Sequence, residues 1–125
     1  MRFSIEGSLP AMNEIVNAAK THWVKYRAQK TAGMTVARAA IRRAKKEKTV
    51  KATKSRVKIL FSHYCEDRRK DPDNIASGAQ KITLDALQEE GVLENDGHKN
   101  IAEIHHRFFF DKKNPRIEVE MAETV

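Results

Sequence analysis

The sequence predicts an α+β domain: a four-stranded mixed sheet with helices packed on it, in the order β-α-α-β-α-β-β. Four short segments, at residues 2–7, 55–66, 101–110 and 116–121, have the apolar patterns of strands. Three longer segments between them repeat apolar side chains at helical spacing. A chain of 125 residues without repeats or linkers fits one domain over residues 1–125.

The amino-terminal half is predicted to hold one strand and two helices. Residues 2–7 alternate between apolar and polar side chains, as a short strand does. Asn13 suits the N-cap of a helix, and residues 14–30 then carry apolar side chains at helical spacing. Gly33 is expected to interrupt this pattern, and a second helix is predicted over Thr35–Lys46.

The second half is predicted to hold a strand, a helix and two further strands. Ser55–Glu66 has apolar side chains on both faces, so burial on both sides in part is expected. The helix over Asp73–Glu90 should end at Gly91 in a left-handed cap. A connection of hairpin length, DKKNP, joins Ile101–Phe110 to Arg116–Met121, and we expect these last two strands to be antiparallel.

Positive charge is concentrated in two places. The formal net charge is +7, and residues 38–58 include ten basic side chains but only one acid, Glu47. Arg68, Arg69 and Lys70 form a second basic group, which we predict to contact DNA. Such clustering suits binding to a phosphate backbone, although an ordinary solvated basic surface would have the same composition.

The cysteine count and the apolar runs indicate a cytoplasmic protein. Cys65 is the only cysteine, which excludes an internal disulfide and a cysteine-rich zinc site. No run of apolar residues reaches the length of a transmembrane helix, and the first ten residues lack a signal-peptide core. We therefore expect a reducing compartment and no membrane partner.

The acidic stretch Asp71-Pro72-Asp73-Asn74 has two interpretations. Pro72 favours an extended Asp71 and suits the first position of a helix. Both carboxylates would then lie at a helix N-terminus, where the helix dipole favours negative charge. In the structural interpretation the acids cap the helix, which is worth about 1 kcal/mol. In the functional interpretation they bind a metal ion.

A polar stripe follows the same predicted helix. Asn74, Gly78, Lys81 and Asp85 fall on one side of it, next to the apolar face. Lys81 and Asp85 could form an ion pair at i,i+4 spacing, worth a few tenths of a kcal/mol. Gly78 costs about 1 kcal/mol relative to alanine inside a helix. A close approach of another backbone or a ligand would explain it, as would a tolerated weak point.

A further acid, Asp96, lies in the predicted turn after this helix. Turn chemistry alone accounts for Asn-Asp-Gly. The functional interpretation is that the returning strand brings Asp96 to Asp71 and Asp73 as a third carboxylate. Three carboxylates repel one another, and Mg²⁺ removes that penalty while polarising a phosphoryl oxygen and activating water. Lys81 would add positive charge to the transition state.

These motifs together resemble the RusA family of Holliday junction resolvases, which occurs in bacteria and prophages. The segments that resemble the family are LPAMNE, RRKDPDNI, KITLDALQEEGVLENDG and IEVEM, and they extend from about Leu9 to Met121. The resemblance implies a homodimeric, Mg²⁺-dependent endonuclease that cuts four-way DNA junctions by paired symmetric incisions. Mn²⁺ is the alternative metal.

Carried over position by position, the resemblance implies that Asp71, Asp73 and Asp96 bind the metal and that Lys81 is essential. Asp85 corresponds to a further acid of the family. Some members place the lysine three residues after the Asn, whereas Lys81 is seven residues after the Asn of this chain. The extra turn keeps the same helix face but moves the lysine about 6 Å along the axis.

Two other functions and one structural question stay open at this point. The chain could be a non-catalytic basic DNA-binding module, or a nuclease that prefers flaps or other branched DNA. Phe108–Phe110 could form the dimer interface, or all three rings could be buried in the core.

Overall fold

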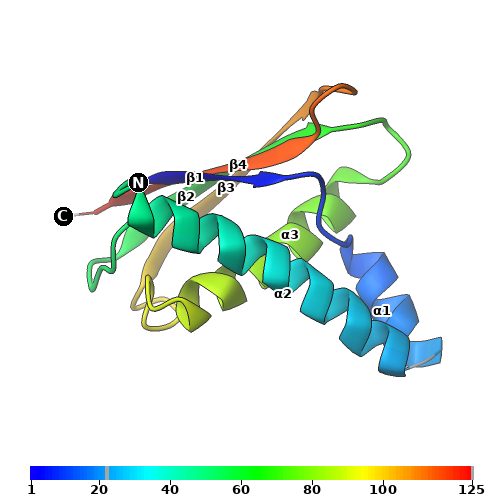
Figure 1. Cartoon of the computed structure of the whole chain (residues 1–125), viewed down its shortest axis with the longest axis horizontal. Helices are drawn as coiled ribbons and strands as arrows, with labels where there is room; N and C mark the ends of the chain where they lie inside the picture. Colours follow the sequence, from blue (N-terminus) through cyan, green and yellow to red (C-terminus); the bar gives the residue numbers. More distant parts are fainter. Residues whose placement is uncertain (22, 125) are drawn as a thin grey trace.

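In the structure, a computed structural model that describes residues 1–21 and 23–124, three helices cover one face of a four-stranded sheet (Figure 1). For residues 18, 19, 21 and 26 only the backbone is described. The elements are β1 (Arg2–Glu6), α1 (Met12–Thr21), α2 (Trp23–Lys46), β2 (Val57–Cys65), α3 (Pro72–Glu89), β3 (Ile101–Phe110) and β4 (Arg116–Glu123). The predicted α+β class and element order are confirmed. Within the described residues, none of the helices combines the length and apolarity that crossing a membrane requires.

The strand order in the sheet is β1-β4-β2-β3. β2 pairs with β3 in parallel, whereas β4 pairs with β1 and with β2 in antiparallel fashion. β3 and β4 therefore run in opposite directions but are not neighbours, because β2 lies between them. The expectation of a paired hairpin was wrong: the connection of hairpin length crosses the end of β2, where the Asp111 N–H donates to the Cys65 carbonyl oxygen at 2.9 Å.

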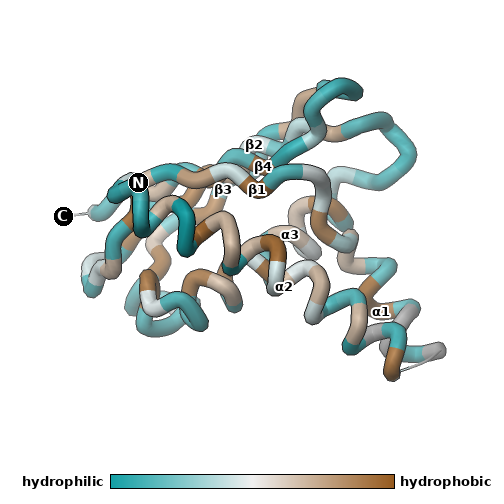
Figure 2. The backbone as a smooth tube through the Cα atoms, viewed as in Figure 1, coloured by the Kyte–Doolittle hydropathy of each residue, from teal (hydrophilic) through white to brown (hydrophobic). Residues whose placement is uncertain are grey.

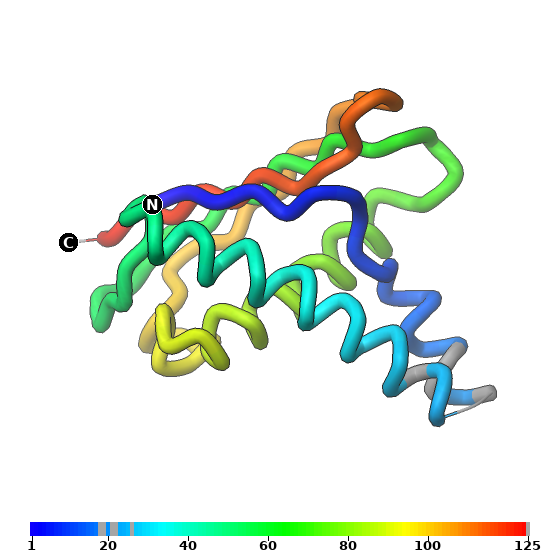
Figure 3. Tube along the Cα trace, viewed as in Figure 1, coloured from blue at the N-terminus to red at the C-terminus, as the bar shows by residue number. Residues whose placement is uncertain are grey.

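The core lies between the inner face of the sheet and the helices. The strand register aligns the inward side chains in rows, such as Phe3 opposite Val119, which in turn is opposite Phe61. These three side chains are buried. The outer face of the sheet carries the alternate, more polar residues, and the trace in Figure 3 shows that no helix covers it. The fold is thus a two-layer arrangement with one open sheet face.

The first helices differ from the predicted boundaries. α1 begins at Met12, before Asn13, and the Asn13 side chain accepts a hydrogen bond from the Glu14 N–H at 3.0 Å. The Glu14 carboxylate in turn accepts from the Ala11 N–H at 3.1 Å. Asn13 is therefore not the N-cap, because the bond from the Ala11 N–H to Glu14 sets the helix start two residues earlier than predicted. α2 continues through Gly33 without a break.

Two helix glycines mark close contacts of backbone with neighbouring elements. A Cβ at Gly33 would lie 2.9 Å from the Ile82 Cδ1 atom, so α2 and α3 approach closely there. A Cβ at Gly78 would lie 2.1 Å from the Pro10 carbonyl oxygen and 2.9 Å from backbone atoms of Ala11. Since such separations are sterically forbidden for a real Cβ, Gly78 is required by the crossing of α3 with the β1–α1 loop. The approach is to a backbone of the same chain.

Candidate metal and DNA site at the start of helix α3

The predicted acidic pair lies at the N-terminus of α3. Asp71 is the N-cap residue, with φ −72° and ψ 139°, and Pro72 occupies the first turn. The Asp71 side chain makes no capping hydrogen bond, and Asp71 and Asp73 are both exposed. The structural interpretation predicted that these carboxylates cap the helix, which Asp71 does not do through its side chain. Both acids therefore present oxygen atoms to solvent at the positive end of the helix dipole.

Local ion pairs neutralise only part of the positive charge in the loop before α3. Lys70 Nζ lies 2.8 Å from a Glu14 carboxylate oxygen, and this hydrogen bond lowers the pKa of Glu14 despite partial burial. Arg69 Nε lies 3.5 Å from Asp67. The Arg68 guanidinium carbon is 4.5 Å from the centre of the Phe110 ring, with no carboxylate partner among the described residues. Figure 2 shows this loop and the β3–β4 turn as hydrophilic segments at the same end of the sheet.

Lys81 lies further along α3 than the acidic pair. It is eight residues after Asp73, which corresponds to about 12 Å along the axis. Its Nζ atom is 4.0 Å from an Asp85 carboxylate oxygen, and the lysine side chain is 46% exposed. The predicted i,i+4 pair is confirmed. This contact places the Lys81 ammonium beside Asp85, one turn further from the acidic pair.

Asp96 is not brought to Asp71 and Asp73 within one chain. It lies in the loop between α3 and β3, after the carboxyl end of the helix, whereas the acidic pair precedes the amino end. Between these two places lies α3, which has 18 residues and is about 27 Å long. Among the described residues no group of three or more His, Cys, Asp or Glu side chains could hold a metal. The expected single-chain cluster of three aspartates was therefore wrong.

A chain of hydrogen bonds beneath α3 was not predicted. Gln80 Oε1 can only accept, so the His106 Nε2–H donates to it at 3.0 Å. His106 Nδ1 then accepts from His63 Nε2 at 2.9 Å. His63 is 1% exposed, and its Nδ1 atom is buried without a partner. The two imidazole rings are nearly parallel, at 16°, with ring centres 5.1 Å apart. Parallel pairing of β2 with β3 makes this contact, and each strand pattern alone contains no sign of it.

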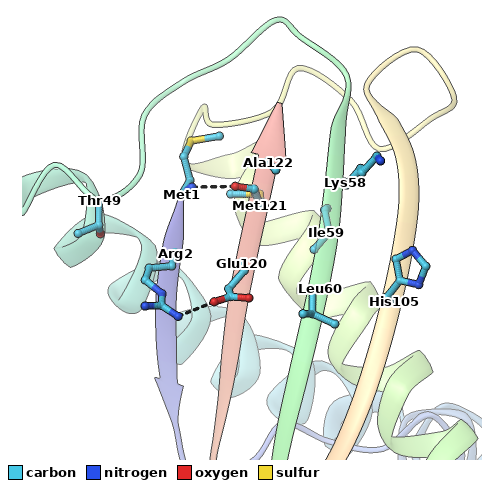
Figure 4. A pocket seen from close by; sticks show the side chains of 10 residues that line it. All are labelled: Met1, Arg2, Thr49, Lys58, Ile59, Leu60, His105, Glu120, Met121 and Ala122. Carbon is cyan, nitrogen blue, oxygen red and sulfur yellow. Dashed lines mark hydrogen bonds and ion pairs between the residues drawn. The ribbon is translucent and has the colours of Figure 1, made fainter. Parts of the chain in front are cut away.

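One hollow beside the sheet lies near the acidic pair, and a second lies away from it on the outer face. A cavity of about 260 Å³ is lined by His63, Lys70 and Ile75, so it lies under the start of α3. A larger, shallow depression of about 560 Å³ lies on the outer face near the termini (Figure 4). Arg2 and Glu120 form an ion pair in it. This depression is at the other end of β2 from the acidic pair and is not part of the candidate site.

Much of the positive charge on α2 stabilises the fold. Arg38 and Arg42 each donate from Nε to a Glu90 carboxylate oxygen at 2.8 Å, and Lys45 Nζ donates to the Glu90 carbonyl oxygen at 2.7 Å. Burial opposes ionisation of Glu90, but the two arginine hydrogen bonds lower its pKa overall. These bases hold the carboxyl end of α3 against α2. Charge counted along the sequence therefore overstates the number of cations available to a partner.

A comparison with protein families identifies the chain. Among curated proteins, none gives a significant match. A family model described as endodeoxyribonuclease RusA matches residues 9–122, which is nearly the whole chain and includes Asp71, Asp73, Lys81 and Asp96. A site of exposed carboxylates beside a basic loop is consistent with the phosphodiester chemistry of an endodeoxyribonuclease. The chain belongs to the RusA family of endodeoxyribonucleases.

Proposed function

We propose that the protein is a Mg²⁺-dependent, structure-specific endodeoxyribonuclease that resolves four-way DNA junctions by paired symmetric hydrolysis, as a homodimer in the bacterial cytoplasm. The observation that carries the proposal is the exposed pair Asp71 and Asp73, beside a basic loop, in a chain of the RusA family. The Asp71 carboxylate makes no capping hydrogen bond to the helix.

The donor set fits a hard cation. Asp71 and Asp73 supply carboxylate oxygens at an exposed position, and Mg²⁺ or Mn²⁺ takes such ligands while keeping several waters. The chemistry that a cation supplies there is polarisation of a phosphoryl oxygen and activation of a water. Arg68, Arg69 and Lys70 precede the pair directly and would hold the phosphate backbone.

The third carboxylate of the proposed site comes from a second copy of the chain. Asp96 and the acidic pair lie beyond opposite ends of α3, a helix about 27 Å long. If a two-fold axis sets the α3 helices of two copies antiparallel, Asp96 of the partner subunit lies beside Asp71 and Asp73, and the reverse holds at the other end. One dimer then has two equivalent sites, as paired cutting of a two-fold symmetric junction requires.

Lys81 is proposed to stabilise developing negative charge. Its position two turns after Asp73, on the exposed border of α3, allows the flexible side chain to extend toward a phosphate held at the helix start. The ion pair with Asp85 keeps the lysine on this side of the helix. We expect Lys81→Ala to reduce cutting while leaving junction binding in place.

Mixing two inactive variants tests the shared site. Asp73→Asn alone should abolish cutting of a synthetic junction in Mg²⁺ and keep or strengthen binding, because a charge near phosphate is removed. Asp96→Asn alone should also be inactive. After the two are mixed and allowed to exchange subunits, half of the dimers are heterodimers with one complete site of two. Single-strand nicking should then return to about a quarter of the wild-type rate.

The outcomes separate the alternatives. A site contained within one chain leaves the mixture inactive, since both chains are then defective. Wild-type protein that binds junctions but never nicks them in Mg²⁺ or Mn²⁺ is a DNA-binding module and not a nuclease. Equal cutting of flaps and junctions would favour the broader branched-DNA nuclease. Glu89→Gln is the matched control, because it removes an exposed carboxylate from α3 outside the proposed metal site and away from the Lys81–Asp85 pair.

A further inference from the structure

The end of β3 carries exposed aromatic rings at the free edge of the sheet. Phe108 packs inward on His63, with ring centres 5.1 Å apart. The side chains of Phe109 and Phe110, however, are 40% and 52% exposed. Of the two alternatives for Phe108–Phe110, burial in the core therefore does not hold for Phe109 and Phe110. β3 is an edge strand, so among the described residues no further strand lies beyond it.

Each exposed ring packs against one neighbouring side chain: Phe109 against Tyr64, and Phe110 against Arg68. Tyr64 stacks on Phe109 with centres 5.0 Å apart, and the Arg116 guanidinium carbon is 3.8 Å from the centre of the Tyr64 ring. Arg116 is itself fixed by Asp111 at 3.0 Å and by a second carboxylate, Glu118, at 3.1 Å. We call Tyr64, Arg68, Phe109, Phe110 and Arg116 the aromatic edge; Tyr64, Phe109 and Arg116 lie on the outer face of the sheet, and Phe110 with Arg68 lies on the opposite face. Because it is preorganised, a flat partner that binds it orders few side chains.

The aromatic edge is next to the proposed metal site. Arg68, which covers one face of Phe110, is three residues before Asp71, so their Cα atoms are at most about 11 Å apart. The loop that contains Arg68 and the turn after β3 lie together at one end of the sheet in Figure 3. Among the described residues, Arg107, Lys112 and Lys113 form no ion pair with an acid there. The surroundings of the rings are therefore suited to an anion with flat, apolar groups.

We propose that the aromatic edge binds unstacked DNA bases at the branch point, with Phe110 and Arg68 stacking on a base beside the phosphate that Asp71 and Asp73 act on. This inference rests on the proposed function. Bases in a continuous duplex have a stacking neighbour on each side, whereas a base at a branch point can lose one and present its face. Stacking on an aromatic ring is tolerant of base identity, so the surface would select structure and not sequence.

The test uses the full-length protein in EDTA, so that binding is measured without cutting. Phe110→Leu keeps an apolar side chain but removes the aromatic face, and Arg68→Lys keeps the charge but removes the planar group. Val36→Ala, which trims an exposed apolar side chain on α2, is the matched control. The ligands are a fixed four-way junction with 2-aminopurine at the branch point and a duplex of the same sequence with the probe in its interior.

Wild-type protein should quench the branch-point probe and leave the duplex probe unchanged. Phe110→Leu should lose this quenching and weaken junction binding by about 5- to 150-fold, with duplex binding changed less than twofold. Arg68→Lys should have a smaller effect, and Val36→Ala none. Unchanged junction affinity and quenching in Phe110→Leu would overturn the proposal, as would an equal loss for junction and duplex.

A second copy of the chain is the competing occupant. If Phe110→Leu converts a dimer to a monomer in sedimentation, the aromatic edge is a protein interface and the proposal fails. Nicking in Mg²⁺ separates this inference from the proposed function. Wild-type nicking with no dependence of binding on Phe110 removes only the inference. Phe110-dependent stacking without nicking removes only the nuclease activity.

Discussion

The hydrogen-bonded histidines His63 and His106 make the free energy of unfolding depend on pH. Burial, together with the charge of His106, lowers the pKa of His63 from 6.5 to about 4. The cause is structural: the Nε2–H donates to His106, and the unpartnered Nδ1 has no acceptor for a proton it would gain. The unfolded chain takes up that proton near pH 6.5, while the folded chain resists it until about pH 4. The contribution of His63 to the free energy of unfolding is therefore complete above pH 6.5 and is lost as the pH falls from 6.5 to about 4.

The perturbation is His63→Gln, which keeps an N–H donor near the Nε2 position and removes the titrating group. With pKa values of 6.5 unfolded and about 4 folded, linkage predicts that His63 alone lowers the free energy of unfolding of the wild type by about 2 kcal/mol at pH 5. At still lower pH this contribution reaches about 3 kcal/mol. Urea unfolding at pH 7.5 and pH 5 measures the loss. The loss in His63→Gln should be smaller by about 2 kcal/mol.

His98 lies in the exposed loop after α3, so His98→Gln should show the wild-type loss between the two pH values. Carboxylates titrate equally in all three proteins, and the difference between variants removes their contribution. If His63→Gln and wild type lose the same free energy, His63 is not held neutral by the fold and the hydrogen-bond assignment fails.

Two further predictions concern glycines. Gly78→Ala should destabilise the protein by about 3 kcal/mol or more, because the added Cβ meets the Pro10 carbonyl oxygen. Ser77→Ala, on the exposed side of α3, is the control and should have little effect in the same urea titration. Gly91→Ala should cost about 1 kcal/mol, because Gly91 has φ +72°, and Gly97→Ala, at a residue without positive φ, is its control. Melting temperatures unchanged by Gly78→Ala would mean that the loop moves away freely.

The sequence predicted individual elements better than their partners. Pro72 and Gly91 mark the two ends of α3 because each acts through local backbone geometry, and both predictions are confirmed. Gly33 was misread because a glycine inside a helix signals either a break or a close contact, and the contact with Ile82 is visible only after folding. The insertion of β4 between β1 and β2 depends on long-range pairing, which alternating side chains do not specify.

The difference between local signals and long-range contacts also explains which parts of the candidate site the sequence predicted. The exposed Asp71–Asp73 pair follows from local sequence, since a proline-containing helix start fixes it. The position of Asp96 depends on the β2-α3-β3 crossover, because α3 connects the end of β2 to the start of its parallel neighbour β3. The carboxyl end of α3 therefore lies near the start of β2 in space, at the opposite end of that strand from the acidic pair. A helix of 18 residues is about 27 Å long, so the length alone argued against a single-chain cluster. The contact between His63 and His106 needed the parallel register and had no local signal.

A site shared between two chains predicts a dependence on protein concentration. One chain has Asp71 and Asp73 at one end of α3 and Asp96 at the other, so a monomer has no complete proposed site. Below the dissociation constant of the dimer, the nicking rate should then fall with the square of protein concentration, because dimers form from two monomers. A site within one chain gives a linear fall instead. Nicking of a junction at subsaturating DNA, over a hundredfold dilution, distinguishes the two slopes. A linear slope while sedimentation shows monomers would refute the shared site. A quadratic slope would explain how cutting is confined to substrates that two chains bind together.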